Sequence, residues 1–328
     1  MTLAALPGGV FVTPGMTRRQ VVRHQRLARL RGAGHTAFVF AGGGSRGAAQ
    51  VGMLQALVDH GIVPDAVYGA SVGALNAAGF AAQPDRAGVQ RMEAIWRTVT
   101  REAVFPSGRI PGPWRFLQQR EAVHSNEGLR QVIETGVPFR NIEEASLRLE
   151  VVATSLTDGR SQWFTEGSAM DAILASAALP ALLPPVTVDG DTFIDGGVRD
   201  NVPIGRAIAQ GANRIFVLLC GPLRYTPHQY RRPVEAVLTA FFIAIHSRFT
   251  RELEVLPRGV EVVVFSVGSE PVSRYDDFSA TDALLVAGRV NAERVLDFWA
   301  RGGLGEADPA GEPLPEPLAS LAPDARTG

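Results

Sequence analysis

Residues 36–61, TAFVFAGGGSRGAAQVGMLQALVDHG, predict a strand, a glycine-rich turn and a helix in immediate succession. The apolar run ends at the glycines, and apolar residues then recur at helical spacing as far as Gly61. The same order follows at once, because DAVYGA (65–70) is strand-like and SVGALNAAGFAAQ (71–83) is helical. Two such units in a row favour a parallel sheet covered by helices.

Strand and helix signals continue to alternate along the chain. We expect further strands at 147–155, 214–220 and 260–268, and helices near 168–178, 203–211, 233–255 and 279–300. Asp-Gly turns predict two hairpins, at 154–164 and 186–195. Together these signals predict an α/β fold with a largely parallel central sheet.

Three zones are expected along the chain. Residues 1–35 form a basic extension, in which 17–32 carry six arginines and no acid, with Thr17 placed to cap a helix. A solvated docking helix is favoured there over contact with anionic lipid or a partner, because its apolar stripe is thin. Residues 36–300 form the folded domain, and 301–328 form a Pro-rich acidic tail expected to be disordered.

Composition excludes several classes of protein. The formal net charge of −1 gives no global attraction to nucleic acid, and the single Cys220 excludes an intrachain disulfide and a cysteine zinc site. No signal peptide is expected, because the basic run follows the first apolar residues instead of preceding them. We expect a cytoplasmic protein, with peripheral membrane contact and the oligomeric state left open.

The glycine-rich turn has two interpretations. Gly42, Gly44 and Gly47 fit the G-x-G-x-x-G pattern of a dinucleotide site, but the same backbone N–H groups could bind an oxyanion. A dinucleotide site needs an acid at the end of the second strand, whereas Asp65 precedes that strand. The oxyanion interpretation is therefore favoured, and no cofactor is expected.

The end of the second strand carries a candidate nucleophile instead. GASVG, residues 69–73, matches G-x-S-x-G between a predicted strand and helix, the setting of a nucleophile elbow. Gly69 and Gly73 would leave room for neighbouring chain, and Ser71 would stand at a helix start. The alternative is that Ser71 is an ordinary helix cap with small neighbours.

A candidate base for this serine lies in FIDGGVRDNVPI, where Asp195 follows a strand and precedes Gly196 and Gly197. On the residues alone, a turn acid that could cap the helix after Pro203 is favoured over a base, because Asp and Gly dominate turns. Asp189 and Asp191 do not fit a calcium-loop spacing, so no metal site is expected.

These motifs resemble those of the patatin-like phospholipase family, in matching order from about Phe38 to Pro203. The matching segments are GGGSRG, GASVGALNA, SAALPALLPPV (176–186) and DGG. The resemblance implies a three-layer α/β/α fold related to α/β-hydrolase-like architectures, and hydrolysis of lipid esters through an acyl-enzyme, phospholipase A-like or lysophospholipase-like, without metal or organic cofactor.

The resemblance also assigns roles by position. Ser71 becomes the nucleophile and Asp195 its partner in a catalytic dyad. The oxyanion loop comprises Gly42, Gly43, Gly44 and Arg46, with motif support from Gly47, Gly69, Gly73, Gly196 and Gly197. Arg46 would either hold a phosphate head group or brace the loop. The stretch 104–125 mixes Pro, Gly and aromatic residues and would form a long loop or cap at the substrate entrance.

Three alternatives remain open. An α/β-hydrolase triad could use His228 or His246, both downstream of Asp195. A binding or regulatory protein could keep the fold without turnover. The substrate could be a small soluble ester or thioester.

An aspartate of ordinary pKa, about 3.9, is a poor base for serine, so desolvation would have to raise the pKa of Asp195. In a histidine triad, the rate is expected to fall as a group near pKa 6.5 is protonated. We expect no such fall for a dyad.

Overall fold

The computed structural model describes residues 34–105, 122, 124–221, 233–267 and 276–301, with two short strands, β1 (Ala4–Leu6) and β2 (Val10–Val12), which pair antiparallel. The expected basic helix at 17–32, most of the 104–125 cap, His228 and the tail beyond 301 lie outside the described residues.

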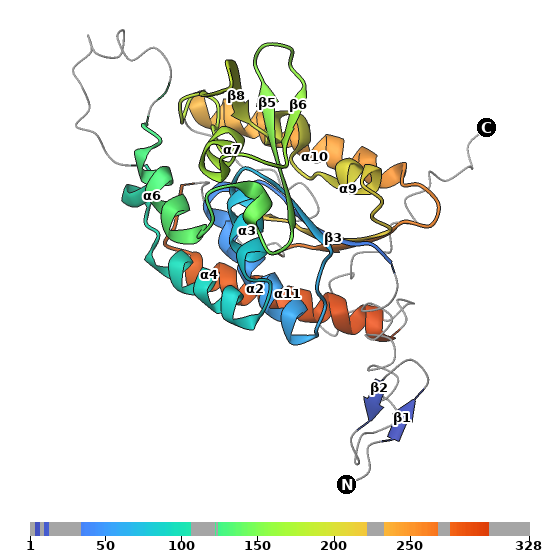
Figure 1. The fold of residues 1–328 in the computed structure, drawn as a ribbon. Coiled ribbons are helices and arrows are strands. Elements are labelled where there is room, and N and C mark those ends of the chain that lie inside the picture. The colour runs from blue at the N-terminus through green and yellow to red at the C-terminus, as the bar shows by residue number, and fades with distance from the viewer. Residues whose placement is uncertain are drawn as a thin grey trace, which may run out of the picture.

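One sheet of eight strands organises the described part of the chain (Figure 1). Its order is β10-β9-β3-β4-β5-β8-β7, and β6 also pairs with β5. The run from β10 to β5 is parallel, whereas β6, β7 and β8 are added antiparallel. The strands are β3 (Thr36–Phe40), β4 (Ala66–Ala70), β5 (Arg148–Ser155), β6 (Ser161–Phe164), β7 (Val186–Val188), β8 (Asp191–Asp195), β9 (Arg214–Leu218) and β10 (Glu261–Phe265). The predicted α/β fold with a largely parallel sheet is confirmed.

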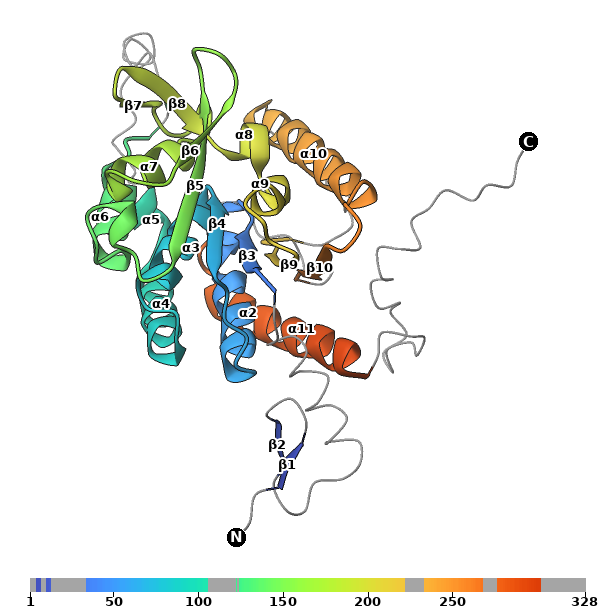
Figure 2. The ribbon, with the colours of Figure 1, turned by 45° about the vertical axis from the view of Figure 1, so that its right-hand side comes forward.

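Helices cover both faces of this sheet, which gives the predicted three layers (Figure 2). In β3, Phe38 and Phe40 belong to the core on one face, while Ala37 and Val39 belong to the core on the other. The alternation follows from the two-residue period of a strand. The first face carries α2 (Ala48–Asp59), α3 (Val72–Ala82), α4 (Arg86–Thr98) and α11 (Thr281–Arg301). The second carries α9 (Ile204–Ala209) and α10 (Pro233–Glu254).

The sequence did not predict four of these helices. They are α4, α5 (Arg101–Val104), α6 (Glu127–Gly136) and α8 (Gly197–Asp200). Helix α7 (Ala169–Ser176) matches a predicted helix. The start of α4 has a recognisable cap, because the Asp85 carboxylate accepts the Gly88 N–H at 2.8 Å. Within the described residues, no helix is both long and apolar enough to cross a membrane.

Helices α2 and α11 touch through their backbones. A Cβ at Gly52 would lie 2.0 Å from the Leu285 carbonyl oxygen, and a Cβ at Gly288 would lie 2.0 Å from the Ala49 carbonyl oxygen. Only glycine permits so close an approach. The C-terminal helix is therefore packed directly on the helix that follows the first glycine-rich turn.

The register of β5 brings two other strand ends together. Ala70, the last residue of β4, is opposite Val152, and Asp195, the last residue of β8, is opposite Ala153. Strand β6 pairs with residues 151–154 and so occupies the other edge of β5. Strands β4 and β8 consequently share one edge of β5, end to end, and the residues that follow β4 meet the end of β8.

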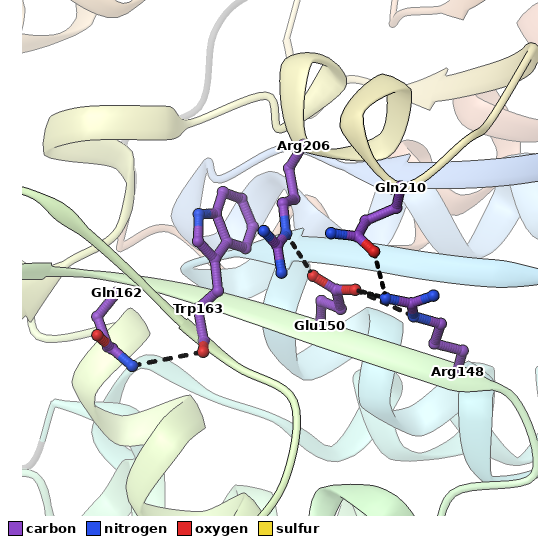
Figure 3. Close-up of polar contacts among 6 residues, drawn as sticks. All are labelled: Arg148, Glu150, Gln162, Trp163, Arg206 and Gln210. Atoms are coloured by element: carbon purple, nitrogen blue, oxygen red, sulfur yellow. Dashed lines mark hydrogen bonds and ion pairs between the residues drawn. The ribbon is translucent and has the colours of Figure 1, made fainter.

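On the second face, a buried carboxylate ties β5 to α9 (Figure 3). The Glu150 side chain is 0% exposed and accepts from Arg206 Nε at 2.6 Å and from Arg148 Nη2 at 2.7 Å. The Arg206 guanidinium also lies 5.2 Å from the centre of the Trp163 ring. Burying an unpaired carboxylate is costly, so each arginine makes the position of Glu150 tolerable.

We predict that Arg206→Leu lowers the free energy of unfolding by about 3 kcal/mol, because it leaves a buried carboxylate with half of its partners. The double variant Arg206→Leu with Glu150→Leu is expected to lose less than the single variant, since it removes the uncompensated charge as well. Urea unfolding at pH 7 measures both. Costs that simply add would contradict this account of the pair.

Candidate active site

Ser71 occupies a strained turn between β4 and α3. Its φ of 56° and ψ of −130° lie in a backbone region that residues other than glycine rarely adopt. The turn is sharp, because a Cβ at Gly69 would lie 2.5 Å from the Gly73 carbonyl oxygen and one at Gly73 would lie 2.2 Å from the Phe40 carbonyl oxygen. This geometry is that of the predicted nucleophile elbow.

The hydroxyl of Ser71 donates directly to a carboxylate. The Ser71 Oγ lies 2.6 Å from Asp195 Oδ2, and Asp195 Oδ1 accepts the Gly197 N–H at 2.7 Å. Asp195 is 1% exposed. The end-to-end arrangement of β4 and β8 on β5 therefore produces a Ser–Asp pair with no intervening group.

Burial raises the pKa of Asp195 to about 6, while the hydrogen bonds from Ser71 and Gly197 act in the opposite direction by favouring the ionised form. At pH 7 the carboxylate is mainly ionised, yet it binds a proton far more readily than an exposed aspartate. The desolvation required by the sequence-based hypothesis is thus present.

The expected pH criterion is wrong for this site. We expected only a histidine to make the rate fall near pH 6.5, but Asp195 itself titrates at about 6. A rate that falls on acidification is therefore compatible with either a dyad or a triad, and the two must be separated by substitution.

The segment SAALP, quoted above only for its resemblance, connects the two candidate residues. Ser176 Oγ accepts the Ser71 N–H at 2.9 Å, and the Ser176 carbonyl oxygen accepts the Gly196 N–H at 3.0 Å. The Ala178 carbonyl oxygen accepts the Asp195 N–H at 2.9 Å. Ser176 is fully buried. Sequence reasoning gave it no role, since a buried serine at the end of a helix carries no local signal of its partner.

The glycine loop, residues 42–47, lies beside Ser71, but its members differ in position. The Gly42 N–H donates to the Asn201 carbonyl oxygen at 3.2 Å and is thereby engaged. Gly43 and Gly44 line the cavity in which Ser71 and Asp195 also lie. Asn201, which sequence reasoning missed, lines it as well.

Arg46 braces this loop. Its Nε donates to the Gly43 carbonyl oxygen at 3.1 Å, and its guanidinium lies 5.2 Å from the centre of the Phe242 ring. The C=O and N–H of one trans peptide point in opposite directions, so the Gly44 N–H points away from Arg46. Burial lowers the pKa of Arg46. Of the two roles considered for this arginine, the contacts favour bracing.

The side-chain amides of two buried residues hold the glycine loop in place. Gln50 Nε2 donates to the carbonyl oxygens of Ala41 and Leu218, at 2.8 Å each, and Asn76 Nδ2 donates to the Gly47 carbonyl oxygen at 2.9 Å. Asn76 Nδ2 also reaches Gln50 Oε1 at 2.7 Å. Both amides are buried, so these bonds fix the ends of β3 and β9, the start of α2 and the middle of α3 relative to one another.

The remaining predicted glycines permit close packing. At each position an added Cβ would lie 2.6 Å or less from a neighbouring atom; these glycines are Gly42, Gly43, Gly47, Gly69, Gly73, Gly196 and Gly197. Gly44 differs, because its φ of 63° is a backbone angle that glycine adopts more easily than any other residue.

An apolar cavity, partly open to solvent, adjoins the pair. Most of its lining residues are aliphatic or aromatic. Many of them belong to α3, α4, α6 and α10; examples are Val72, Leu75, Met92, Trp96, Leu129, Val132, Phe241 and Phe242. No histidine of the described residues lines it. His246 lies on α10, and His228 lies outside the described residues.

Strain at Ser71 gives a testable difference between two variants that both lack the hydroxyl. We predict that Ser71→Gly is more stable than Ser71→Ala by about 1 kcal/mol, since glycine adopts a positive φ without the clash of a Cβ. Both lack the hydroxyl, so Ser71→Ala is the matched control. Thermal or urea unfolding provides the measurement, and equal stabilities would mean that the turn stores no strain.

The glycine loop gives a rescue experiment. A Cβ at Gly43 would lie 2.2 Å from Cys220 Cβ and 3.0 Å from its Sγ, but 3.7 Å from its Cα. We predict that Gly43→Ala lowers kcat/KM on a soluble ester by about 10- to 1000-fold through a displaced oxyanion donor. Adding Cys220→Gly should restore part of this loss. Cys220→Gly alone is the control, and a double variant no better than Gly43→Ala would overturn the explanation.

Comparisons with known proteins agree on one family. The family model described as Patatin-like phospholipase matches residues 38–208. The chain is 30% identical over 214 residues to "Lysophospholipase NTE1" of Yarrowia lipolytica, covering 62% of this chain and 14% of that protein. It is 26% identical over 310 residues to "Lysophospholipase NTE1" of Meyerozyma guilliermondii, covering 85% of this chain and 20% of that protein. The chain thus spans a fifth or less of these relatives.

Among solved structures, VipD from Legionella pneumophila aligns with 90% of this chain and 69% of its own, at 16% identity and a TM-score of 0.46. The family model extends from within β3 into α9 and takes in the glycine loop, Ser71 and Asp195. Because that match covers more than half of the 328 residues, the chain belongs to the patatin-like phospholipase family.

Proposed function

We propose that this chain hydrolyses lipid acyl esters, in the manner of a phospholipase A or a lysophospholipase, with Ser71 and Asp195 as a catalytic dyad. The observation that carries the proposal is the 2.6 Å hydrogen bond from Ser71 Oγ to a buried Asp195 at the wall of an apolar cavity. Family membership and the names of the relatives support the lipid substrate.

In the first half of the reaction, Asp195 Oδ2 accepts the Ser71 proton as Oγ attacks the acyl carbonyl carbon. The negative charge that develops on the carbonyl oxygen is stabilised by the N–H groups of Gly43 and Gly44. Asp195 then returns the proton to the departing alcohol oxygen. The products are the released alcohol and an acyl ester of Ser71.

In the second half, water attacks the acyl-enzyme and Asp195 takes the proton of that water. Collapse of the intermediate releases the fatty acid, and the proton passes back to Ser71 Oγ. The start of α3 favours negative charge at Ser71, which assists both attacks. No step in this scheme uses a metal or an organic cofactor.

The proposal extends to the surroundings of the site. A lipid substrate would bring the chain into peripheral contact with a lipid surface, with the apolar cavity receiving one acyl chain. Arg46 acts by holding the Gly43–Gly44 peptide in position. The domain proposed for this activity comprises residues 36–300.

Substitution separates the dyad from a triad. We predict that Asp195→Asn reduces kcat/KM on a soluble acyl ester to near the level of Ser71→Ala, because an amide can bond Ser71 but cannot accept its proton. His246→Ala and His228→Ala should retain most of the activity. A folded histidine variant without activity, beside an active Asp195→Asn, would replace the dyad with a triad.

The same preparations carry a pH signature. Wild-type kcat/KM should fall about tenfold per unit below pH 6, as Asp195 becomes protonated. The pKa of Asp195 is higher folded than unfolded, so its ionisation opposes folding as pH rises from about 4 to about 6. Asp195→Asn should therefore be at least as stable as the wild type above pH 6, which distinguishes loss of a base from loss of fold.

A further inference from the structure

The apolar cavity extends along one face of α3, away from Ser71. Leu75 and Gly79 follow Ser71 at intervals of four residues, and all three line the cavity. Residues four apart lie one above another on a helix. At 1.5 Å per residue, Gly79 lies about 12 Å from Ser71 along the helix axis.

Helices α4 and α6 provide the opposite walls with the same periodicity. Leu129, Val132 and Gly136 of α6 line the cavity at spacings of three and four, and α4 contributes Met92 and Trp96. The three helices pack against one another in pairs, at the same side of the sheet (Figure 1). Along α3, the cavity lining thus extends from Ser71 as far as Gly79, where this helix approaches Gly136 of α6.

The backbone conformation at Gly79 and Gly136 does not require glycine. Neither has a positive φ. A Cβ at Gly79 would lie 3.5 Å from Met92 and 3.7 Å from the Gly136 carbonyl oxygen, and a Cβ at Gly136 would lie 3.9 Å from Leu75. These are ordinary contacts, unlike the 2.0 Å approach at Gly52. Glycine inside a helix such as α3 also lowers stability relative to alanine.

The two glycines therefore enlarge the cavity at the cost of helix stability. We infer that Gly79 and Gly136 form the far end of the acyl-chain pocket and set the longest acyl chain that it can bury. This inference rests on the proposed function and adds to it the chain length of the substrate.

The length follows from simple geometry. An extended alkyl chain advances about 1.25 Å per carbon, given a C–C bond near 1.5 Å. A chain attached at Ser71 reaches Gly79, about 12 Å away, with about ten carbons. Esters of about ten carbons therefore place their terminal carbons between the two glycines.

The experiment compares p-nitrophenyl esters of four to twelve carbons. Each buried methylene is worth about fourfold in kcat/KM, so wild-type values should rise with length up to about ten carbons and no further. Gly79→Leu and Gly136→Leu should stop the rise about three carbons earlier, a loss of about fiftyfold at ten carbons. The loss should therefore be smallest on the four-carbon ester and should grow with chain length up to ten carbons.

Two variants control for folding. Gly205→Leu, in α9, is the matched substitution, since a Cβ there meets nothing within 4 Å and Gly205 does not line the cavity. It should leave the profile unchanged. Gly79→Ala adds one methyl group to a better helix former, and should shorten the profile by about one carbon in a chain at least as stable.

An unchanged profile in Gly79→Leu, an equal loss at every chain length, or the same shift in Gly205→Leu would overturn the inference. Binding separates this failure from that of the proposed function. In Ser71→Ala, fatty acids of increasing length should displace a fluorescent fatty acid with the same ten-carbon limit, shortened by Gly79→Leu. If no ester is hydrolysed by the wild type, the proposed function fails, and the displacement series still decides the role of the glycines.

Discussion

Two backbone turns at the ends of neighbouring parallel strands pass within atomic contact of each other, and the rest of the site depends on that contact. The Cβ that Gly73 lacks would lie 2.2 Å from the Phe40 carbonyl oxygen, and the Cβ that Gly42 lacks would lie 3.0 Å from Ser71 Cβ. So close an approach leaves backbone carbonyls without water, and the buried amides of Gln50 and Asn76 supply their hydrogen bonds. Packing and hydrogen bonding thus fix one arrangement of the glycine loop against Ser71.

How far the sequence predicts this site depends on whether a signal is local. The turn at Ser71 and the glycine loop each lie within one strand–turn–helix unit, where glycine spacing and hydrophobic period are informative. Asp195 was different, because its meeting with Ser71 depends on β8 pairing antiparallel with β5. The residues alone offered Asp195 as a candidate base, and only the family resemblance favoured that role over a turn acid. Ser176 and Asn201 act through partners more than 100 residues away, which no local pattern records. Helices α4 and α6 were missed, and with them one side of the cavity wall.

The site combines two features that oppose folding. A non-glycine residue is held at positive φ, and a carboxyl is buried whose pKa rises to about 6. Each is offset by bonds from the same short segment, since Ser176 accepts the Ser71 N–H and Ala178 accepts the Asp195 N–H. Desolvation raises the pKa of the Asp195 carboxyl, so this carboxyl binds a proton more readily than an exposed aspartate does. Stability elsewhere, from the apolar cores on the two faces of the sheet, allows these local losses.

The backbone contact between α2 and α11 connects the C-terminal helix to the glycine loop, which follows the central strand β3. Helix α2 starts where the glycine loop ends, and Gly288 presses on Ala49, less than one turn into that helix. A force applied to the outer surface of α11 would thus reach the loop through a rigid and very short path. The fragment 38–208, which sequence similarity delimits, keeps every candidate group but loses the back wall that holds them in register.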